Sequence, residues 1–595
     1  MQSESFSNMY SILREAGGSK DRFGGPPVHY LGSGYLFYGD APHSMISGES
    51  GSGKTTACIL PTIHSLLDSS ESFLCTDPKG EIYLTFRDII PPDYNVVLLD
   101  FRNIHQSPGF NPLRYPYELY KTQDPQKMQI AVELLDDLCY AILPQGKDKD
   151  PFWADSARAV LLSAIQILFR FAKPEQCTLA NCYYLISDGE ERYGMSTVLK
   201  ELYDALDEDF LPKMLLQTYF TASDTRAGIR STFLTALSPF VKSQGLVEML
   251  ASDDFKINHL DGKKKTAIFL CVPEETPIYY GIGAIIVNQI ANHCIRIAHD
   301  SYNGTLPTRM NLILDEAANL APALPYLDHL LSACRSRGIR ISLAIQSFKQ
   351  LEEAYGPYKA ATILDNCGLL ISFRTRNMET LVELSKRCGE RVVEVNGHLQ
   401  TEPLITPHQI STMQKGQALV QFGSVQYVTK LPPYKDVYGD LKSDAPYPAR
   451  KKVPVAPRLN LKELISTLKG HRQALDGNRS DDPQISRYGI DQLLKDLDEK
   501  FKDLDEKRTV SETTDTGNAQ NQFTITIVGF DPSRKREVIN AMRRIRPMPI
   551  HNIALILDHQ LPFDMAHKSC ADAQLAMRIL VKAGAEVVGP TPDDS

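Results

Sequence analysis

The chain has 595 residues, 43% of them hydrophobic and 23% charged, a composition that predicts a soluble globular protein of several domains. Its net charge of −8 excludes a uniformly basic nucleic-acid-binding protein, so any nucleic-acid surface must be a local patch. The eleven cysteines form no C-x-x-C pair and no cluster at metal-ligand spacing, which excludes a zinc module and favours reduced thiols.

Residues 1–27 are polar and contain glycine, and they are predicted to form an N-terminal arm. From residue 28 short apolar runs alternate with helical patterns, which is typical of a parallel α/β sheet. Residues 120–255 instead contain one helical pattern after another. The strands predicted in the first stretch are Tyr35–Tyr38, Ser44–Ser47, Phe73–Thr76 and Val96–Asp100.

Strand patterns return in residues 256–440. The strands predicted there are Thr266–Val272, Asn311–Leu314, Ile341–Ile345, Leu369–Phe373 and Ala418–Phe422. The predicted fold class is therefore α/β, with one sheet domain built from residues 28–119 and 256–440. An all-helical insertion domain at 120–255 interrupts it, and a Pro-rich, then helical linker at 441–521 leads to a small α/β domain at 522–595.

A phosphate-binding loop follows the second predicted strand. The segment from Gly48 to Thr55 matches G-x-x-x-x-G-K-[ST] and opens a helix, as the motif requires. Its backbone N–H groups are predicted to surround the β-phosphate of ATP, with Lys54 on the β/γ-phosphates and Thr55 on Mg²⁺. The residues predicted to bind the nucleotide are Gly48, Glu49, Ser50, Gly51, Ser52, Gly53, Lys54, Thr55 and Thr56.

Two adjacent carboxylates follow the strand Asn311–Leu314. Asp315 is predicted to hold the Mg²⁺ through water, and Glu316 is predicted to be the general base that activates the attacking water. Gln346 ends the strand Ile341–Ile345, where it is predicted to sense the γ-phosphate. Arg335 is the preferred candidate for an arginine that stabilises transition-state charge on a neighbouring subunit, with Arg337 and Arg340 as alternatives.

At this point the chain resembles the type IV secretion coupling proteins of bacterial conjugation over about residues 28–435. Besides the P-loop, the motifs that carry the resemblance are Thr76–Glu81, Gly109–Leu113, Asp150–Trp153, Asp315–Glu316, Ser336–Gly338 leading to Gln346, Asn366–Cys367, Leu384–Ser385 and Gly389. Only the P-loop is specific by itself, and the order of the motifs strengthens the assignment.

The resemblance implies a RecA-like motor fold and a homo-hexameric ring whose helical domain faces the cytoplasm. It implies ATP hydrolysis coupled to the transfer of single-stranded DNA, with its relaxase and relaxosome, into a type IV secretion channel. By position, Lys54, Thr55, Asp315, Glu316, Arg335 and Gln346 match the working residues of the family. Lys79 and Glu81 match a motif expected to act in structure or in subunit contact.

Two features depart from the family. Coupling proteins usually begin with a membrane anchor, whereas here no apolar segment precedes the P-loop, so we expect a protein at the cytoplasmic face whose membrane contact is made through a partner. The acidic net charge slightly favours an alternative in which the cargo is protein. A nucleotide-dependent docking scaffold is a further alternative, against which the intact set of Lys54, Thr55, Asp315 and Glu316 argues.

The second departure is the C-terminal part, which resembles the C-terminal domain of the bacterial ribosomal stalk protein. The resemblance rests on Thr524–Phe530, the helix around Lys535–Ile545, and Ala573–Gly584 followed by Ala585–Val588. Where the stalk protein has a Gly/Lys-rich turn, this chain has Arg546–His551, so translation-factor binding is not expected. A protein-docking module and a structural appendage remain open.

Overall fold

The computed structural model describes residues 23–469, with gaps at 41, 145–150, 209, 274, 396–397, 444–456 and 467. In the C-terminal part it describes 523–530, 563–567, 585–592 and the single positions 538, 542, 557 and 580. Most of the predicted arm and linker, Asp150 and most of the predicted C-terminal helices lie outside these residues. The chain divides into two units, Met1–Gly477 and Asn478–Ser595, which are described separately.

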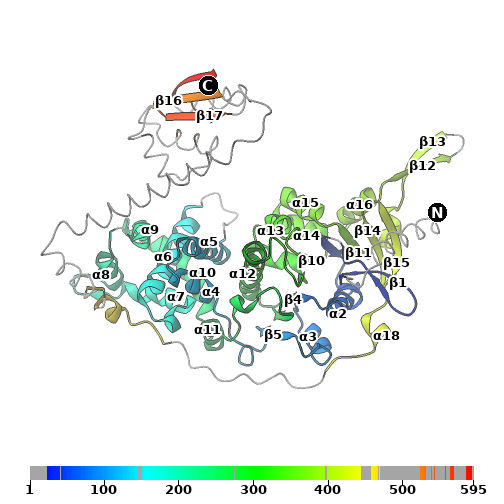
Figure 1. The fold of residues 1–595 in the computed structure, drawn as a ribbon, viewed down its shortest axis with the longest axis horizontal. Coiled ribbons are helices and arrows are strands. Elements are labelled where there is room, and N and C mark those ends of the chain that lie inside the picture. The colour runs from blue at the N-terminus through cyan, green and yellow to red at the C-terminus, as the bar shows by residue number, and fades with distance from the viewer. Residues whose placement is uncertain are drawn as a thin grey trace. The chain divides into compact units, whose positions relative to one another are not determined.

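A nine-stranded sheet is the centre of the first unit (Figure 1), in the order β15-β14-β11-β3-β10-β9-β4-β8-β5. The seven strands from β11 to β5 are parallel, and β14 and β15 extend the sheet antiparallel. Its strands are β3 (His43–Ser47), β4 (Ser72–Thr76), β5 (Asn95–Asp100), β8 (Thr266–Cys271), β9 (Met310–Leu314), β10 (Ile339–Ile345), β11 (Leu369–Phe373), β14 (Gln417–Phe422) and β15 (Val425–Lys430).

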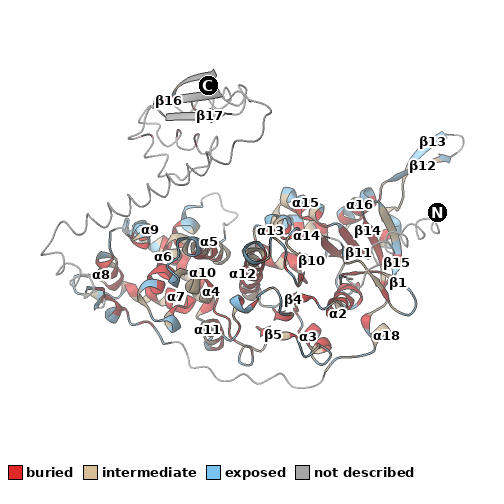
Figure 2. Ribbon diagram, viewed as in Figure 1, coloured by how far each residue is buried: buried red, intermediate tan, exposed pale blue. Residues whose placement is uncertain are grey.

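The central strands β3, β4, β8, β9 and β11 are buried at every position, which explains their continuous apolar sequences (Figure 2). Helices cover the sheet because crossover connections between parallel strands place them on its faces. The helices of the sheet region are α2 (Leu60–Asp68), α3 (Glu81–Phe86), α12 (Pro277–Ser301), α13 (Leu327–Cys334), α14 (Phe348–Tyr355), α15 (Pro357–Asn366), α16 (Met378–Arg387), α17 (Pro407–Ser411) and α18 (Tyr434–Tyr438).

Between β5 and β8 the chain leaves the sheet and forms the helical insertion (Figure 1). The helices are α4 (Arg114–Lys121), α5 (Pro125–Ile142), α6 (Phe152–Phe171), α7 (Leu179–Ser187), α8 (Val198–Ala205), α9 (Leu211–Leu216), α10 (Ser223–Leu237) and α11 (Gln244–Ala251). Short helical turns at Pro174–Gln176, Asp188–Glu190, Ser238–Phe240 and Ile257–His259 link them or precede β8. The predicted α/β class with an all-helical insertion is confirmed.

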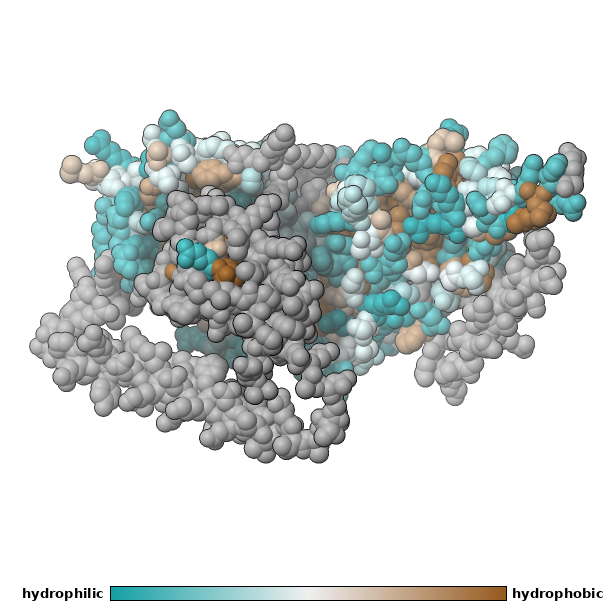
Figure 3. Space-filling view, turned by 90° about the horizontal axis from the view of Figure 1, so that it is seen from above, coloured by the Kyte–Doolittle hydropathy of each residue, from teal (hydrophilic) through white to brown (hydrophobic). Residues whose placement is uncertain are grey.

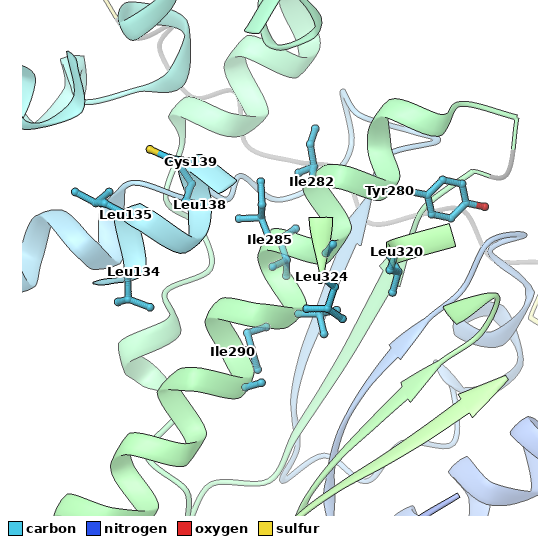
Figure 4. Packing of buried hydrophobic residues seen from close by; sticks show 14 of the residues in the cluster. Leu134, Leu135, Leu138, Cys139, Tyr280, Ile282, Ile285, Ile290, Leu320 and Leu324 are labelled. Atoms are coloured by element: carbon cyan, nitrogen blue, oxygen red, sulfur yellow. The ribbon is translucent and has the colours of Figure 1, made fainter. Parts of the chain in front are cut away.

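One hydrophobic cluster joins the helical insertion to one face of the sheet. Figure 4 shows α12 at this junction, with Ile282, Ile285 and Ile290 among the side chains of the cluster. Leu134 and Leu138 of α5 belong to the same cluster. Because interiors are packed as densely as organic crystals, this shared core holds the two regions as one unit.

Among the described helices, α6 alone is long and apolar enough to cross a membrane, and 67% of its apolar window is buried. Ala157, Leu161 and Ile165 of α6 are fully buried in the cluster of the helical insertion. Burial of this kind is what a core helix shows.

Several strands were not predicted. They are β1 (Pro27–Tyr30), β12 (Glu390–Val395) with β13 (His398–Pro403), and the short pair β6 (Arg192–Tyr193) with β7 (Ser196–Thr197). The predicted strand Tyr35–Tyr38 is found as β2 (Tyr35–Phe37), but it pairs with β1 in a hairpin outside the nine-stranded sheet. The β12–β13 hairpin exposes Val392 and Leu399 by 65% and 77%. The coloured residues on the face shown in Figure 3 are mainly hydrophilic, with small hydrophobic patches.

The second unit contains a three-stranded antiparallel sheet in the order β17-β16-β18. Its strands are β16 (Phe523–Phe530), β17 (Phe563–His567) and β18 (Ala585–Pro592). Two of them contain the predicted strand segments Thr524–Phe530 and Ala585–Val588. The likeness to the stalk-protein domain stays a prediction.

Candidate active site

The carboxyl ends of three neighbouring strands bring the predicted catalytic groups together. β3 leads into the P-loop, β9 into Asp315 and β10 into Gln346, and the three strands are parallel neighbours in the order β3-β10-β9. Parallel strands present their carboxyl ends at one edge of the sheet, where ligands bind in open α/β folds. The strand order therefore explains how residues 300 positions apart meet.

The P-loop takes a backbone path that requires glycine. Gly53 has φ of +114°, and a Cβ added to Gly48 would lie 2.6 Å from Ser52 Oγ and 2.8 Å from Phe373 Cβ. The loop is tied to the sheet because Gly48 N donates to Ile345 O at 3.2 Å. The result is a close-packed loop that ends at the first turn of a helix, where backbone N–H groups attract anions.

The helix after the loop opens with a π-helical segment, Lys54–Ile59, before it continues as α2. Pro61 lies at the start of α2 and has no N–H to donate, and its ring clashes with the carbonyl four residues earlier in a regular helix. A wider turn relieves this clash. The segment carries Lys54 and Thr55, so the irregularity lies directly under the site.

Lys54 is buried and held by its own loop. Its Nζ donates to Gly48 O at 2.7 Å and lies 3.9 Å from Glu316 Oε1, with the two side chains only 6% and 12% exposed. At 3.9 Å the ion pair is at the outer limit of direct contact. The ammonium has three N–H donors and therefore keeps donors available for a phosphate oxygen.

Asp315 lies at the centre of a small hydrogen-bond network. Thr55 Oγ1 donates to Asp315 Oδ2 at 3.1 Å, and Glu316 N donates to Asp315 Oδ1 at 3.1 Å. Thr76 Oγ1, at the end of β4, donates to the Asp315 carbonyl at 3.0 Å. A hydroxyl and a carboxylate held side by side supply the oxygen donors that Mg²⁺ prefers, so Thr55 and Asp315 fit the predicted metal role.

Glu316 is held in an uncommon conformation. Its φ is +51°, in the left-handed region that non-glycine residues adopt rarely and that is found at functional sites. Gln346 Nε2 donates to Glu316 Oε2 at 3.2 Å, which fixes the carboxylate from the neighbouring strand. The structure thus brings Lys54, Thr55, Asp315, Glu316 and Gln346 together.

Asp77 in the Thr76–Glu81 motif has a structural role that was not predicted. Its buried Oδ2 accepts from Ile82 N at 2.9 Å and from Tyr83 N at 3.0 Å, so it caps the first turn of α3. Burial raises the pKa of Asp77 to about 7, against the effect of these hydrogen bonds. The motif also places Lys79 and Glu81 on the wall of the site.

Arg335 does not reach this site. It follows α13 at the amino end of β10, whereas Gln346 follows the carboxyl end, and a seven-residue strand spans about 20 Å. Arg337 Nη1 donates to Ala333 O at 2.5 Å, and Arg340 Nη1 donates to Arg335 O at 2.9 Å. The guanidinium groups of Arg337 and Arg340 therefore hydrogen-bond to nearby backbone carbonyls, while the Arg335 side chain is exposed.

Two further features near the site were missed. Arg374, which follows β11, forms an ion pair with Glu49 at 2.7 Å, and its carbonyl accepts from Glu49 N at 3.1 Å. Lys415, in the turn before β14, lines the same cavity as the P-loop. Sequence motifs could not identify Arg374 or Lys415, because their positions near the site depend on which strands lie beside β3.

The site is a cavity of about 220 Å³ lined by Ser50, Gly51, Gly53, Lys54, Thr55, Thr56, Asp77, Pro78, Lys79, Glu81, Asp315, Glu316, Gln346 and Lys415. Next to it, the buried Ser52 Oγ has no hydrogen-bond partner among the described residues. The P-loop amides, the ammonium of Lys54 and the oxygen pair of Thr55 and Asp315 fit a magnesium-bound nucleoside triphosphate.

A second cavity, of about 490 Å³, lies where β5 and β8 end, and it is lined in part by Asn103, His105, Ser243 and Tyr279. Its one pair of opposite charges, Arg102 and Glu275, is joined at 2.7 Å. The cavity contains none of the predicted catalytic residues, so its greater volume does not make it the active site.

Comparison with known proteins supports the family that the sequence motifs indicated. The model of the type IV secretory system conjugative DNA transfer family matches residues 1–436. The conjugal transfer protein TraG of Rhizobium radiobacter is 24% identical over 400 residues, which cover 64% of this chain and 59% of that protein. The type IV secretion system-coupling protein VirD4 of Bartonella henselae is 22% identical over 390 residues, which cover 62% and 58%.

The fold is that of solved coupling proteins. The plasmid coupling protein TrwB in complex with an ATP analogue aligns with a TM-score of 0.55 at 17% identity, covering 74% of this chain and 95% of that one. This confirms the predicted RecA-like architecture. The matched segment spans about three fifths of the length of the curated relatives. With most of its residues matched by the family model, the chain belongs to the type IV secretory system conjugative DNA transfer family.

Proposed function

We propose that this protein is an ATPase motor that couples the hydrolysis of Mg²⁺-bound ATP to the transfer of single-stranded DNA, with its relaxase, into a type IV secretion channel. The observation that carries the proposal is the joint placement of Lys54, Glu316 and Gln346 with the Thr55–Asp315 pair. A protein that only bound nucleotide would not need the carboxylate of Glu316 held beside the phosphate-binding lysine.

The residues divide the work as follows. Lys54 neutralises the β- and γ-phosphates, and Thr55 and Asp315 hold the Mg²⁺, which when bound offsets the charge that develops on the phosphates. Glu316 Oε1 orients the attacking water and accepts its proton, while Gln346 holds Oε2. Solved TrwB complexes with an ATP analogue, and with ADP and Mg²⁺, support these ligands.

A homo-hexameric ring would supply the arginine that the site lacks. Arg335 is exposed at the amino edge of the sheet, far from its own P-loop, so it would act on the nucleotide of a neighbouring subunit. Arg335→Ala should reduce hydrolysis only in the assembled ring. Mixing it with Glu316→Gln subunits should restore part of the activity, and no restoration at any mixing ratio would exclude action across subunits.

The proposed setting is the cytoplasmic face of the membrane, where the ring would meet relaxosome and channel and contact the membrane through a partner protein. The family match supports the setting. The net charge of −8 also favours a second candidate, a coupling protein whose cargo is protein.

Steady-state ATP hydrolysis by the purified chain, with and without single-stranded DNA at low and moderate salt, tests the proposal. Stimulation by DNA that fades as salt rises is expected for a DNA motor with a local basic channel, because phosphate contacts weaken with salt. Hydrolysis that does not respond to DNA would favour protein cargo. Absence of hydrolysis would favour a docking scaffold.

A further inference from the structure

The cations and carboxylates of the cavity are distributed unevenly about the P-loop. On the side of β10, β9 and β4 the lining contains the carboxylates of Asp77, Glu81, Asp315 and Glu316 and one cation, Lys79. On the side of β11 and β14 the charged lining residue among the described residues is Lys415, while Arg374 and Arg376, outside the lining, pair with Glu49. A nucleotide in the P-loop therefore has a mainly acidic, metal-binding side and a side on which Lys415 is the charged group.

Lys415 reaches the site because of the direction of β14. This strand runs antiparallel to β11, with Ala418 opposite Phe373, so the residues before it lie at the carboxyl edge of the parallel strands. β11 in turn pairs with β3, with Ser372 opposite Ser47, immediately before the P-loop. Lys415 is thus two strands from the P-loop strand, on the side opposite Asp315.

The turn that carries Lys415 is tightly bonded. Gln417 N donates to Gln414 O at 2.9 Å, and Leu431 N donates to Gly416 O at 2.7 Å. Gly416 has φ of +81°, and a Cβ there would lie 3.1 Å from Leu431 O. The backbone of Lys415 is therefore held in place before any ligand binds, and only the side chain has to be ordered.

Lys415 is exposed, and within the described residues its ammonium has no hydrogen bond or ion pair. Lys54, by contrast, is held by Gly48 O and lies near Glu316. A solvated lysine at the edge of a phosphate-binding cavity, free of any internal carboxylate, is suited to meet an anion that arrives with the ligand.

We infer that Lys415 binds the nucleoside end of the nucleotide, at the α-phosphate and ribose, and does not take part in the attack on the γ-phosphate. The inference rests on the proposed function. The reacting phosphate must lie beside Asp315 and Glu316, so the rest of the nucleotide leaves the P-loop on the opposite side, toward Lys415. Because ATP and ADP share this part, Lys415 should strengthen the binding of both equally.

The test measures the Kd of ATP and of ADP with Mg²⁺ by calorimetry, and kcat and KM for hydrolysis, on the full chain. The Glu316→Gln background keeps ATP intact during the binding measurement. Lys415→Ala should weaken both nucleotides about tenfold, the effect of losing one hydrogen bond to a charged group, and should raise KM by a similar factor. Lys415→Arg should restore most of the affinity.

Lys430→Ala is the matched control, because Lys430 is also exposed, lies opposite Gln417 on the same hairpin and does not line the cavity. It should leave both Kd values unchanged. Loss of affinity for ATP alone, a fall in kcat at saturating ATP, equal losses in the two lysine variants, or no change in Lys415→Ala would each overturn the inference. Each of these outcomes leaves ATP hydrolysis by the unmutated protein intact, so only the inference about Lys415 fails. If the unmutated protein neither binds nor hydrolyses ATP, the proposed function fails as well.

Discussion

The two edges of the nine-stranded sheet both place charged side chains between neighbouring strands, yet they do so in opposite ways. At the amino edge, Arg309 and Glu71 precede β9 and β4 and are each 5% exposed, with Arg309 Nε 2.7 Å from Glu71 Oε2. Glu71 also accepts from Gly24 N and Asn311 Nδ2, each at 2.8 Å. At the carboxyl edge, Lys54 and Glu316 remain 3.9 Å apart.

The difference separates a structural ion pair from a ligand site. A buried pair is tolerated when hydrogen bonds satisfy its remaining donors and acceptors, as at Glu71 and Arg309, where Arg309 also donates to the carbonyls of Gly24 and Gly39. At the P-loop, Lys54 and Glu316 are not in close contact, so N–H donors of Lys54 remain available for a phosphate oxygen. Variants at the amino edge should therefore affect stability, and variants at the carboxyl edge should affect turnover.

The largest expected effect is that of Lys54→Ala at the carboxyl edge. It should lower ATP turnover by at least about 10³-fold, because the principal cation on the reacting phosphates is lost. The free energy of unfolding without nucleotide should fall less than in Arg309→Ala, because Lys54 and Glu316 lie 3.9 Å apart whereas Arg309 and Glu71 are in direct contact at 2.7 Å. Hydrolysis assays and urea unfolding measure the two quantities. A large loss of stability would show that the two edges are not distinct.

Glu316→Gln should cost about 10²- to 10⁴-fold in kcat, because the group that accepts the proton of the attacking water is lost. ATP binding should persist, since Lys54, Thr55 and Asp315 are unchanged. Equilibrium binding of ATP beside the turnover assay checks both statements. Normal turnover in this variant would remove Glu316 from its assigned role.

At the amino edge, Arg309→Ala should lower the free energy of unfolding by about 3–5 kcal/mol, because Glu71 would be left as a buried charge without its partner. Arg102→Ala is the control, since Arg102 and Glu275 form an exposed pair, 39% and 62% exposed, whose loss should cost less than about 1 kcal/mol. Urea unfolding of the two variants side by side makes the comparison. Equal losses of unfolding free energy in the two variants would contradict the distinction between buried and exposed ion pairs.

Much of the carboxyl edge could be predicted from sequence, because the P-loop, Asp315 and Gln346 each follow a buried strand. Each predicted strand was found within a few residues, but Tyr35–Tyr38 lies in a separate hairpin with β1 and not in the nine-stranded sheet. The amino edge and the side of the P-loop that carries Lys415 could not be predicted. Glu71 and Arg309 meet only because β4 and β9 are neighbours, and Lys415 reaches the site only because β14 is antiparallel. Strand order and direction arise from tertiary packing, which local sequence patterns do not specify.

The smallest predicted effect is a pH dependence at the amino edge, at the first residue of β3. His43 Nε2 donates to Leu331 O at 2.8 Å, and Ile341 N donates to His43 Nδ1 at 3.1 Å, so the buried ring is neutral and both nitrogens are engaged. Burial, aided by the nearby positive charges of Arg340 and Arg335, lowers the pKa of His43 to about 4.

Because the folded pKa of His43 lies below the ordinary value of 6.5, the unfolded chain takes up the proton first. The stabilisation is therefore complete above about pH 6.5 and is lost as pH falls toward 4, by up to about 3 kcal/mol. Replacing His43 with Gln should flatten the slope of unfolding free energy in this range by about 1.4 kcal/mol per pH unit. Buried His293, whose pKa is also about 4, stays in both proteins and keeps its own share of the slope. An unchanged slope in the variant would mean that the folded protein accepts a protonated imidazole at His43. The proposed difference between a buried amino edge and a ligand-accessible carboxyl edge would then not hold at this position.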